Sequence, residues 1–149
     1  MKLFHLSDVL SVTTGRLVST RHIDGVYDLL NFLTGDRLFT HQLPRASREC
    51  EPWLRSQFPQ LMEDSAEIAQ QLNRLSTVCD GKPTETERAA AVASFVENIR
   101  RDLGLPEMIP VYEMGVDMHT RIDPIDEARA MFGDSRVLTI DVEDSDASA

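Results

Sequence analysis

Single glycines stand at the ends of segments whose apolar residues follow helical spacing, and this punctuation constrains the chain to a series of short helices. Such segments end at Gly15, Gly35, Gly81, Gly104 and Gly133. Glycine adopts the left-handed backbone conformation at little cost, so it is the preferred residue where a helix ends. The sequence of 149 residues therefore predicts a mainly helical fold.

Several helix starts are marked as well. Ser7 is the expected N-cap of the first helix. Thr84 and Glu87 have the spacing of a capping box, in which each side chain bonds an orphan backbone amide. Asp123 and Pro124 mark the start of a short helix near the C-terminus.

Between residues 37 and 58 the helical pattern is interrupted by Pro52. Proline lacks an amide donor and clashes with the preceding turn, yet it is favourable at a first helical position. The sequence therefore leaves two alternatives open. One is a single helix that is kinked or broken at Pro52, and the other is a pair of short helices at about 41–50 and 52–58.

Two segments, 110–114 and 137–142, favour strands through their β-branched and aromatic residues, whereas 16–19 is either a short strand or a linker. We therefore predict an α+β fold: a mainly helical single domain with a small two- or three-stranded sheet formed largely by the C-terminal third. Residues 1–60 form a helical N-terminal module in this scheme. Residues 61–142 add helices and the sheet to the same domain, and 143–149 form a disordered acidic tail.

Charge is divided unevenly along the chain. Residues 1–60 carry seven basic and six acidic side chains, whereas residues 61–149 carry eight basic and nineteen acidic ones. The net charge of −10 argues against direct binding to nucleic acid, because phosphates would repel the protein. An acidic surface could instead imitate phosphates towards a basic partner, or serve only solubility, and both alternatives stay open. The acidic candidates are Asp117, Asp123, Asp126, Glu127, Asp141, Glu143 and Asp144.

A basic cluster lies in the first half of the chain. If residues 41–50 are helical, spacings of four and three place His41, Arg45 and Arg48 on one face, where arginine forks could bind a carboxylate or phosphate. Trp53 is a possible interface anchor beside this face. The alternative is that Arg45 pairs with Glu49 within the chain. The candidate site for a partner or anion therefore comprises Arg37, His41, Gln42, Arg45, Arg48 and Trp53.

Patterns typical of common enzymes are missing from the sequence. It contains no nucleophile-elbow turn and no glycine-rich phosphate loop, and the acidic loop around His119 matches no standard metal pattern. We therefore expect no catalytic residue, no metal and no cofactor. Cys50 has no clear role, and Cys79 is expected to be buried on an apolar helical stripe.

Cysteine content and hydropathy also bear on location. Two cysteines provide neither a metal pair nor a disulfide scaffold, which is typical of a reducing cytoplasm. No apolar run approaches the ~20 residues that a membrane span needs, and polar residues interrupt the N-terminus too early for a signal peptide. We therefore expect a cytoplasmic protein without membrane contact.

Three stretches resemble a known group of proteins. SDVLSVTTGRLVS (7–19), DGVYDLLNFLTGD (24–36) and LFTHQLPRAS (38–47) are similar to the N-terminal module of small uncharacterised phage and prophage proteins, over residues 6–60. The resemblance implies an accessory phage gene, expressed in the host bacterial cell. Short acidic proteins in that setting often block host defences, as anti-CRISPR proteins do. No functional residue is transferred by the resemblance.

Together these features favour a phage-encoded, non-enzymatic binding protein that inhibits a host defence or nucleic-acid-handling complex by occlusion. Its expected partner is a host protein or nucleoprotein complex. The alternative is a small-molecule or nucleotide-binding protein, or an enzyme, that uses the face from His41 to Arg48. A structural phage component that self-associates, for example as a homodimer, is the third possibility.

Overall fold

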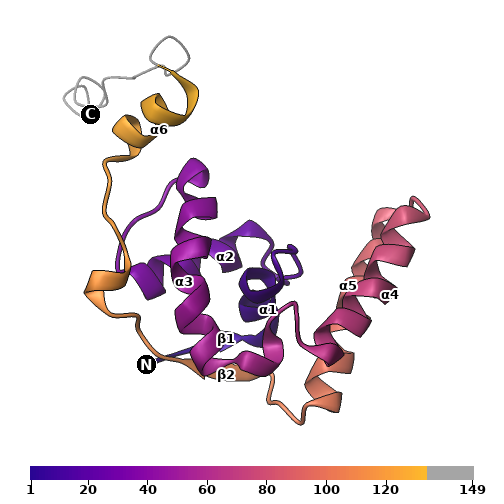
Figure 1. Cartoon of the computed structure of the whole chain (residues 1–149). Coiled ribbons are helices and arrows are strands. Elements are labelled where there is room, and N and C mark those ends of the chain that lie inside the picture. Colours follow the sequence, from indigo (N-terminus) through magenta and orange to yellow (C-terminus); the bar gives the residue numbers. More distant parts are fainter. Residues whose placement is uncertain (134–149) are drawn as a thin grey trace, which may run out of the picture.

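The computed structural model describes residues 1–133, which form a helical body with two projecting arms (Figure 1). Helices α1, α2 and α3 pack against one another in the body, next to a two-stranded sheet. One arm is the hairpin of α4 and α5, and the other is the chain that leads to α6 (Figure 1). The α-helices are Leu6–Thr14, Ile23–Thr34, Leu43–Gln57, Ala66–Asp80, Glu85–Asp102 and Pro124–Phe132 for α1 to α6, and the 3-10 helices η1 to η3 are Thr40–Gln42, Pro59–Leu61 and Val116–Met118.

The core lies where the three body helices meet. The buried residues of α3 are Leu43, Ala46, Cys50 and Leu54, whose spacings of three and four form one apolar stripe. This stripe packs with buried leucines of α1 and α2, each of which contributes about 2 kcal/mol of burial free energy. Ile99 extends the core into the base of α5.

The helix boundaries agree with most of the predicted signals. Gly15 and Gly35 both adopt left-handed conformations at φ 68°, and the capping box of Thr84 and Glu87 is formed. The predicted cap of α1 is wrong, because Ser7 lies inside the helix. His5 is the N-cap instead, and its Nδ1 accepts a hydrogen bond from the backbone N–H of Ser7 at 3.1 Å.

A small two-stranded sheet is present, and the strand predicted at 110–114 overlaps β2, but the placement of the sheet differs from the prediction. Strand β1 (Lys2–His5) pairs antiparallel with β2 (Met108–Val111), with Phe4 opposite Ile109. The sheet therefore joins the N-terminus to the chain after α5, rather than forming largely within the C-terminal third. Four residues that run directly into a helix, without a turn between them, carry no sequence signal for a strand. The strand predicted at 137–142 and the tail predicted at 143–149 lie outside the described residues.

Pro52 lies within a single helix. Helix α3 continues from Leu43 to Gln57, so the alternative of two separate helices is wrong. Its buried stripe runs through both sides of Pro52, from Cys50 to Leu54. The free energy from this packing outweighs the loss of one backbone hydrogen bond.

The prediction that Cys79 is buried is wrong, and the two cysteines lie in opposite environments. Cys79 is exposed near the tip of the α4–α5 arm, because the arm has left the body there and nothing described covers the end of its apolar stripe. Cys50 is fully buried in α3, and burial raises the pKa of its thiol to about 12. Of the two thiols, only that of Cys79 is therefore accessible to a reagent in solution.

This difference gives a direct test of the packing of α3. An aromatic disulfide reagent is expected to modify one thiol in the folded protein and both thiols in denaturant. The variant Cys79→Ser should show no reaction until it is unfolded. Rapid modification of Cys50 in the folded variant would contradict the buried position of this side chain.

No helix among residues 1–133 combines the length and the apolar character that crossing a membrane requires.

Candidate functional site

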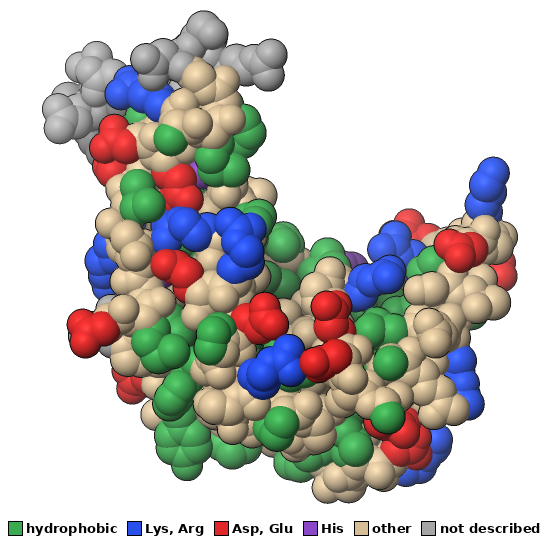
Figure 2. All heavy atoms as spheres, viewed as in Figure 1, with side chains coloured by type: hydrophobic (Ala, Val, Ile, Leu, Met, Phe, Trp, Pro, Cys, Tyr) green, Lys and Arg blue, Asp and Glu red, His purple; other side chains and the backbone are tan. Residues whose placement is uncertain are grey.

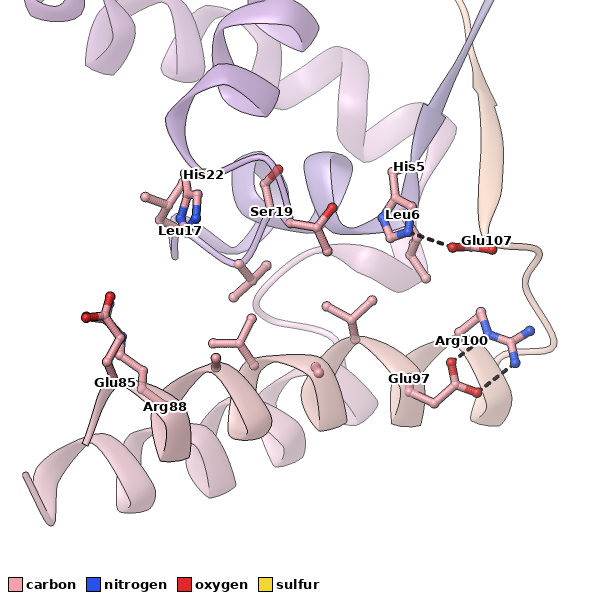
Figure 3. Close-up of a pocket in the computed structure, with 16 residues that line it drawn as sticks. His5, Leu6, Leu17, Ser19, His22, Glu85, Arg88, Glu97, Arg100 and Glu107 are labelled. Atoms are coloured by element: carbon pink, nitrogen blue, oxygen red, sulfur yellow. Dashed lines mark hydrogen bonds and ion pairs between the residues drawn. The ribbon is translucent and has the colours of Figure 1, made fainter. Parts of the chain in front are cut away.

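A groove of about 850 Å³ separates α5 from the segment that connects α1 to α2. Figure 3 shows Leu17, Ser19 and His22 on one side and residues of α5 on the other. The surface is hollowed between the body and the α4–α5 arm, as Figure 2 shows. The groove is therefore an open surface site between the body and this arm.

The walls of the groove are aliphatic. Helix α5 contributes Ala89, Val92, Ala93 and Val96, which line the groove together with Leu17 of the connecting segment. Leu17 leaves 47% of its surface exposed, although its neighbour Val18 is buried in the core. On α5, Ala89 and Ala93 are exposed, whereas Val92 and Val96 are partly buried against the core. Exposed aliphatic side chains that line one groove are a common feature of binding surfaces.

The local sequence explains why α5 leaves this face open. Phe95 and Ile99 are buried, whereas the stripe at 89, 92, 93 and 96 follows helical spacing on an adjacent face. Helix α5 contacts α1 of the body, but the arm projects away from the body (Figure 1). Residues 85–90, at the start of α5, are therefore exposed. This second stripe is the sequence signal that could have indicated the groove.

The two ends of the groove differ in charge pairing. At one end, Glu97 forms two hydrogen bonds with Arg100, at 2.7 and 2.8 Å, and Glu107 contacts His5 at 3.2 Å. At the other end lie Glu85 and Arg88 of α5 and His22 before α2, as Figure 3 shows. Within the described part of the chain, Arg88 forms no ion pair. The groove thus combines an aliphatic middle, one end where Glu97 and Arg100 form an ion pair, and one end where Glu85 and Arg88 form none within the described residues.

A buried polar network fixes the connecting segment beside the groove. The carboxylate of Asp8, which is 1% exposed, accepts hydrogen bonds from the Ser19 hydroxyl at 2.5 Å and from Arg21 at 2.8 Å. Gly25 lies against this network, since a Cβ there would be 2.2 Å from Asp8 Oδ1. Together with the amides of Val18 and Thr20, which bond to Ser11 and Ser7, the network ties residues 18–21 to α1.

His5, Ser7 and Glu107 are arranged like a hydroxyl–imidazole–carboxylate relay. Ser7 Oγ is 2.7 Å from Nδ1 of His5, and Nε2 of His5 is 3.2 Å from Glu107. Ser7 is fully buried, however, and its Oγ also accepts the backbone N–H of Thr20. The arrangement therefore caps α1 and does not present a nucleophile to the groove.

The predicted basic cluster is bound to the chain's own C-terminal part. Arg45 holds Glu127 of α6 with both arms of its guanidinium, Nε to Oε2 at 2.7 Å and Nη2 to Oε1 at 2.9 Å. Its remaining nitrogen, Nη1, contacts Glu49 at 3.0 Å and Thr120 O at 2.7 Å. The predicted pair of Arg45 with Glu49 is thus present. The hydrogen bond from Arg45 lowers the pKa of the Glu127 carboxyl, although burial opposes this change.

Some of the other residues of the predicted cluster form hydrogen bonds within the chain, and the rest are exposed to solvent. Gln42 is buried and donates to Glu127 Oε1 and Ile122 O, and His41 contacts Pro124 O at 2.7 Å. Trp53 Nε1 donates to the carbonyl of Tyr112 at 2.9 Å. The two remaining arginines are exposed and form no ion pair within the described residues: Arg37 and Arg48.

A second polar cluster, for which the sequence carries no local signal, is centred on His119. His119 has a side chain that is 2% exposed, with Nδ1 at 2.7 Å from Glu49 and Nε2 at 2.9 Å from Asp36. The hydrogen bond with His119 lowers the pKa of Asp36. Burial opposes a lowered pKa at Glu49, but the N–H of Thr120 and the contact with His119 outweigh it.

Glu127 does not share an exposed acidic surface with the other acidic candidates. Asp117, Asp123 and Asp126 are exposed, whereas Glu127 is 8% exposed and paired with Arg45. Asp123 also caps α6 by accepting the N–H groups of Ile125 and Asp126. Asp141, Glu143 and Asp144 lie outside the described residues.

No group of His, Cys, Asp and Glu within residues 1–133 is arranged as a metal site.

The comparisons with known proteins match only the first part of the chain. Residues 4–64 match a family model described as a domain of unknown function, DUF7736. This range contains α1, α2 and α3, and one wall of the groove, but not α5. Neither a curated protein nor a solved structure matches the chain.

Proposed function

We propose that this chain is a non-enzymatic binding protein that inhibits a partner macromolecule by occlusion, with a segment of the partner lying in the groove between α5 and residues 16–22. The observation that carries this proposal is the aliphatic groove itself, which has exposed Leu17 on one wall and Ala89 and Ala93 on the other. The lining from Glu85 to Arg100 corresponds to about 22 Å of helix, or about four turns.

The partner segment fitted by this groove is an amphipathic helix with an aliphatic face. Ala89 and Ala93 lie one helical turn apart and are both exposed, so another backbone can approach α5 closely. Arg88, at the end of the groove, would attract an acidic side chain of that helix. The expected contact is thus apolar in the middle and charged at one end.

The nature of the partner rests on the resemblance and on charge. The similarity of residues 6–60 to phage proteins supports a host defence complex, or another complex that handles nucleic acid, as the target. Exposed Asp117, Asp123 and Asp126 would add long-range attraction to a basic partner. The His41–Arg48 face is a weaker candidate, because an anion could reach Arg45 only by displacing Glu127.

A second candidate function is binding of a small apolar molecule in the same groove. Its volume of about 850 Å³ falls within the range of about 300–1,000 Å³ that ligand pockets occupy. Such a ligand would stabilise the purified protein against heat in the absence of any partner.

Two variants in which an alanine of α5 is replaced by arginine test the groove. The tagged protein is first used to identify a partner by capture from bacterial lysate, and the affinity of the purified pair is then measured. Ala93→Arg should weaken binding at least about tenfold, because a bulky cation would fill the aliphatic groove. Ala90→Arg is the matched control, since Ala90 is exposed on the same helix but does not line the groove.

Equal affinities for the two variants would rule out the groove as the binding surface. A steep loss of affinity with salt, together with a loss on reversing Asp117, Asp123 and Asp126 to lysine, would place the contact on the acidic surface instead. Thermal stabilisation by an apolar ligand, lost only in Ala93→Arg, would favour the small-molecule alternative.

A further inference from the structure

Residues 112–132, here named the C-terminal strap, are held to the body mainly by polar contacts. Arg45 and Gln42 bind Glu127, and His119 bridges Asp36 and Glu49. Further hydrogen bonds join the strap to the body through Trp53 to Tyr112 O, Thr120 N to Glu49, and Arg121 to Gly35 O. Its apolar contribution to the core is small, with Met114 as the one strap residue of the core cluster.

The bridge of His119 requires a particular protonation state. An ionised carboxylate only accepts hydrogen bonds, and a neutral imidazole has one N–H donor and one bare nitrogen. Both ring nitrogens of His119 contact carboxylates, so both contacts are favourable only when the ring carries two protons. When one proton leaves, a bare nitrogen faces a carboxylate oxygen in a site that is nearly closed to water.

The surrounding charges agree with this state. From the body, Asp36, His41, Arg45, Glu49 and the Cys50 thiol lie around the bridge, and from the strap Arg121 and Glu127. With a charged ring, the three carboxylates are balanced by His119 and two arginines. With a neutral ring, the cluster retains one unbalanced negative charge.

We propose that His119 is a pH-dependent latch, which holds the C-terminal strap against α3 when the ring is charged and releases it when the ring loses a proton. Release uncovers Gln42 and Arg45, whose donors then become available to a carboxylate from outside the chain. The same pair of residues that is closed by Glu127 would thereby become an anion site as the pH rises.

At low pH the latch opens for a different reason, the protonation of Asp36 and Glu49. The pKa values of Asp36 and Glu49 are lowered in the folded protein, so their contribution is present above the ordinary carboxyl range and is lost as the pH falls through the lowered values. The latch is therefore closed in the interval where both carboxyls are ionised and the ring still carries two protons. It opens on either side of that interval.

Amide hydrogen exchange of the full chain tests the latch. Between about pH 5 and about pH 8, where histidine side chains change charge, protection of α6 amides should fall about tenfold after correction for intrinsic exchange rates. Trp53, the single tryptophan, reports the same event because its indole N–H contacts Tyr112 at the start of the strap. Its emission should shift to the red as the strap opens.

The variant Asp36→Asn separates a latch from ordinary packing. Asp36 Oδ1 accepts the N–H of Arg37, and Oδ2 faces His119 Nε2. An asparagine amide nitrogen in place of Oδ2 can donate to the bare nitrogen of a neutral ring, while the other ring nitrogen still donates to Glu49. We therefore expect the strap of Asp36→Asn to stay closed across the same pH interval, with no tenfold change in α6 protection.

His41→Gln is the control, because His41 contacts Pro124 O of the strap and a glutamine amide keeps a donor for this carbonyl without titrating; it should retain the pH response of the natural sequence. Protection of α6 that does not change between the two pH values would overturn the latch. An Asp36→Asn variant with the same pH response as the natural sequence would also overturn it.

Discussion

Replacing Gly25 by alanine is expected to lower the free energy of unfolding by about 3 kcal/mol, at the upper end of the cost of overpacking a core. The new Cβ would lie 2.2 Å from Asp8 Oδ1 and 2.3 Å from Ser19 Oγ, closer than atoms can approach. Asp8 cannot move away freely, because it is buried and bonded to both Ser19 and Arg21. Either α2 shifts away from α1 or the hydrogen-bond network breaks.

Urea denaturation followed by circular dichroism measures this change, and Gly115→Ala is the matched control. Gly115 has an ordinary φ of −63°, and a Cβ there would meet no atom within 4 Å. The control should unfold within about 0.5 kcal/mol of the natural sequence. If Gly25→Ala were equally stable, the close packing of α2 on Asp8 would be incorrect.

The second large effect is expected at Arg45. Arg45→Met preserves much of the apolar stem but leaves Glu127, which is 8% exposed, without its cation. An uncompensated carboxylate at this depth should cost the docked strap about 2 kcal/mol, equivalent to roughly a thirtyfold loss of amide protection in α6. Hydrogen exchange at neutral pH measures this loss, whereas the body helices should keep their protection.

Arg48→Met provides the comparison for this effect. Arg48 lies on the same helix, is exposed and forms no ion pair within the described residues. Its replacement should leave α6 protection unchanged within about 0.5 kcal/mol. Equal behaviour of the two variants would mean that the Arg45–Glu127 contact does not hold the strap.

Local signals predicted most of the helices and a strand that overlaps β2, but not the strand that pairs with it. A cap such as Thr84 or Gly35 acts within a few residues, so it can be recognised in the sequence alone. Strand β1 has no such signal, because its pairing with β2 depends on a segment about 100 residues away. The cap of α1 was misassigned for the same reason, since β1 places His5 directly before the helix.

Candidate residues could be proposed from the sequence, but their partners could not. The spacing of His41, Arg45 and Arg48 indicated a basic face, and Glu127 belonged to a separate acidic set. The structure brings Arg45 and Glu127 together, which no local pattern encodes. The groove was missed because Ala89, Val92, Ala93 and Val96 read as one side of an ordinary amphipathic helix. Only the structure shows that Ala89 and Ala93 on this side are exposed.

The pairing of β1 with β2 also sets the order of events during synthesis. The first strand leaves the ribosome about 100 residues before its partner, an interval of about 5–20 s at ordinary elongation rates. Throughout that time Phe4 has no Ile109 opposite it, and the amide of Leu6 lacks the carbonyl of Glu107. The matched segment 4–64 can thus assemble its three helices early, but the strand at its start is completed only once α5 has been translated.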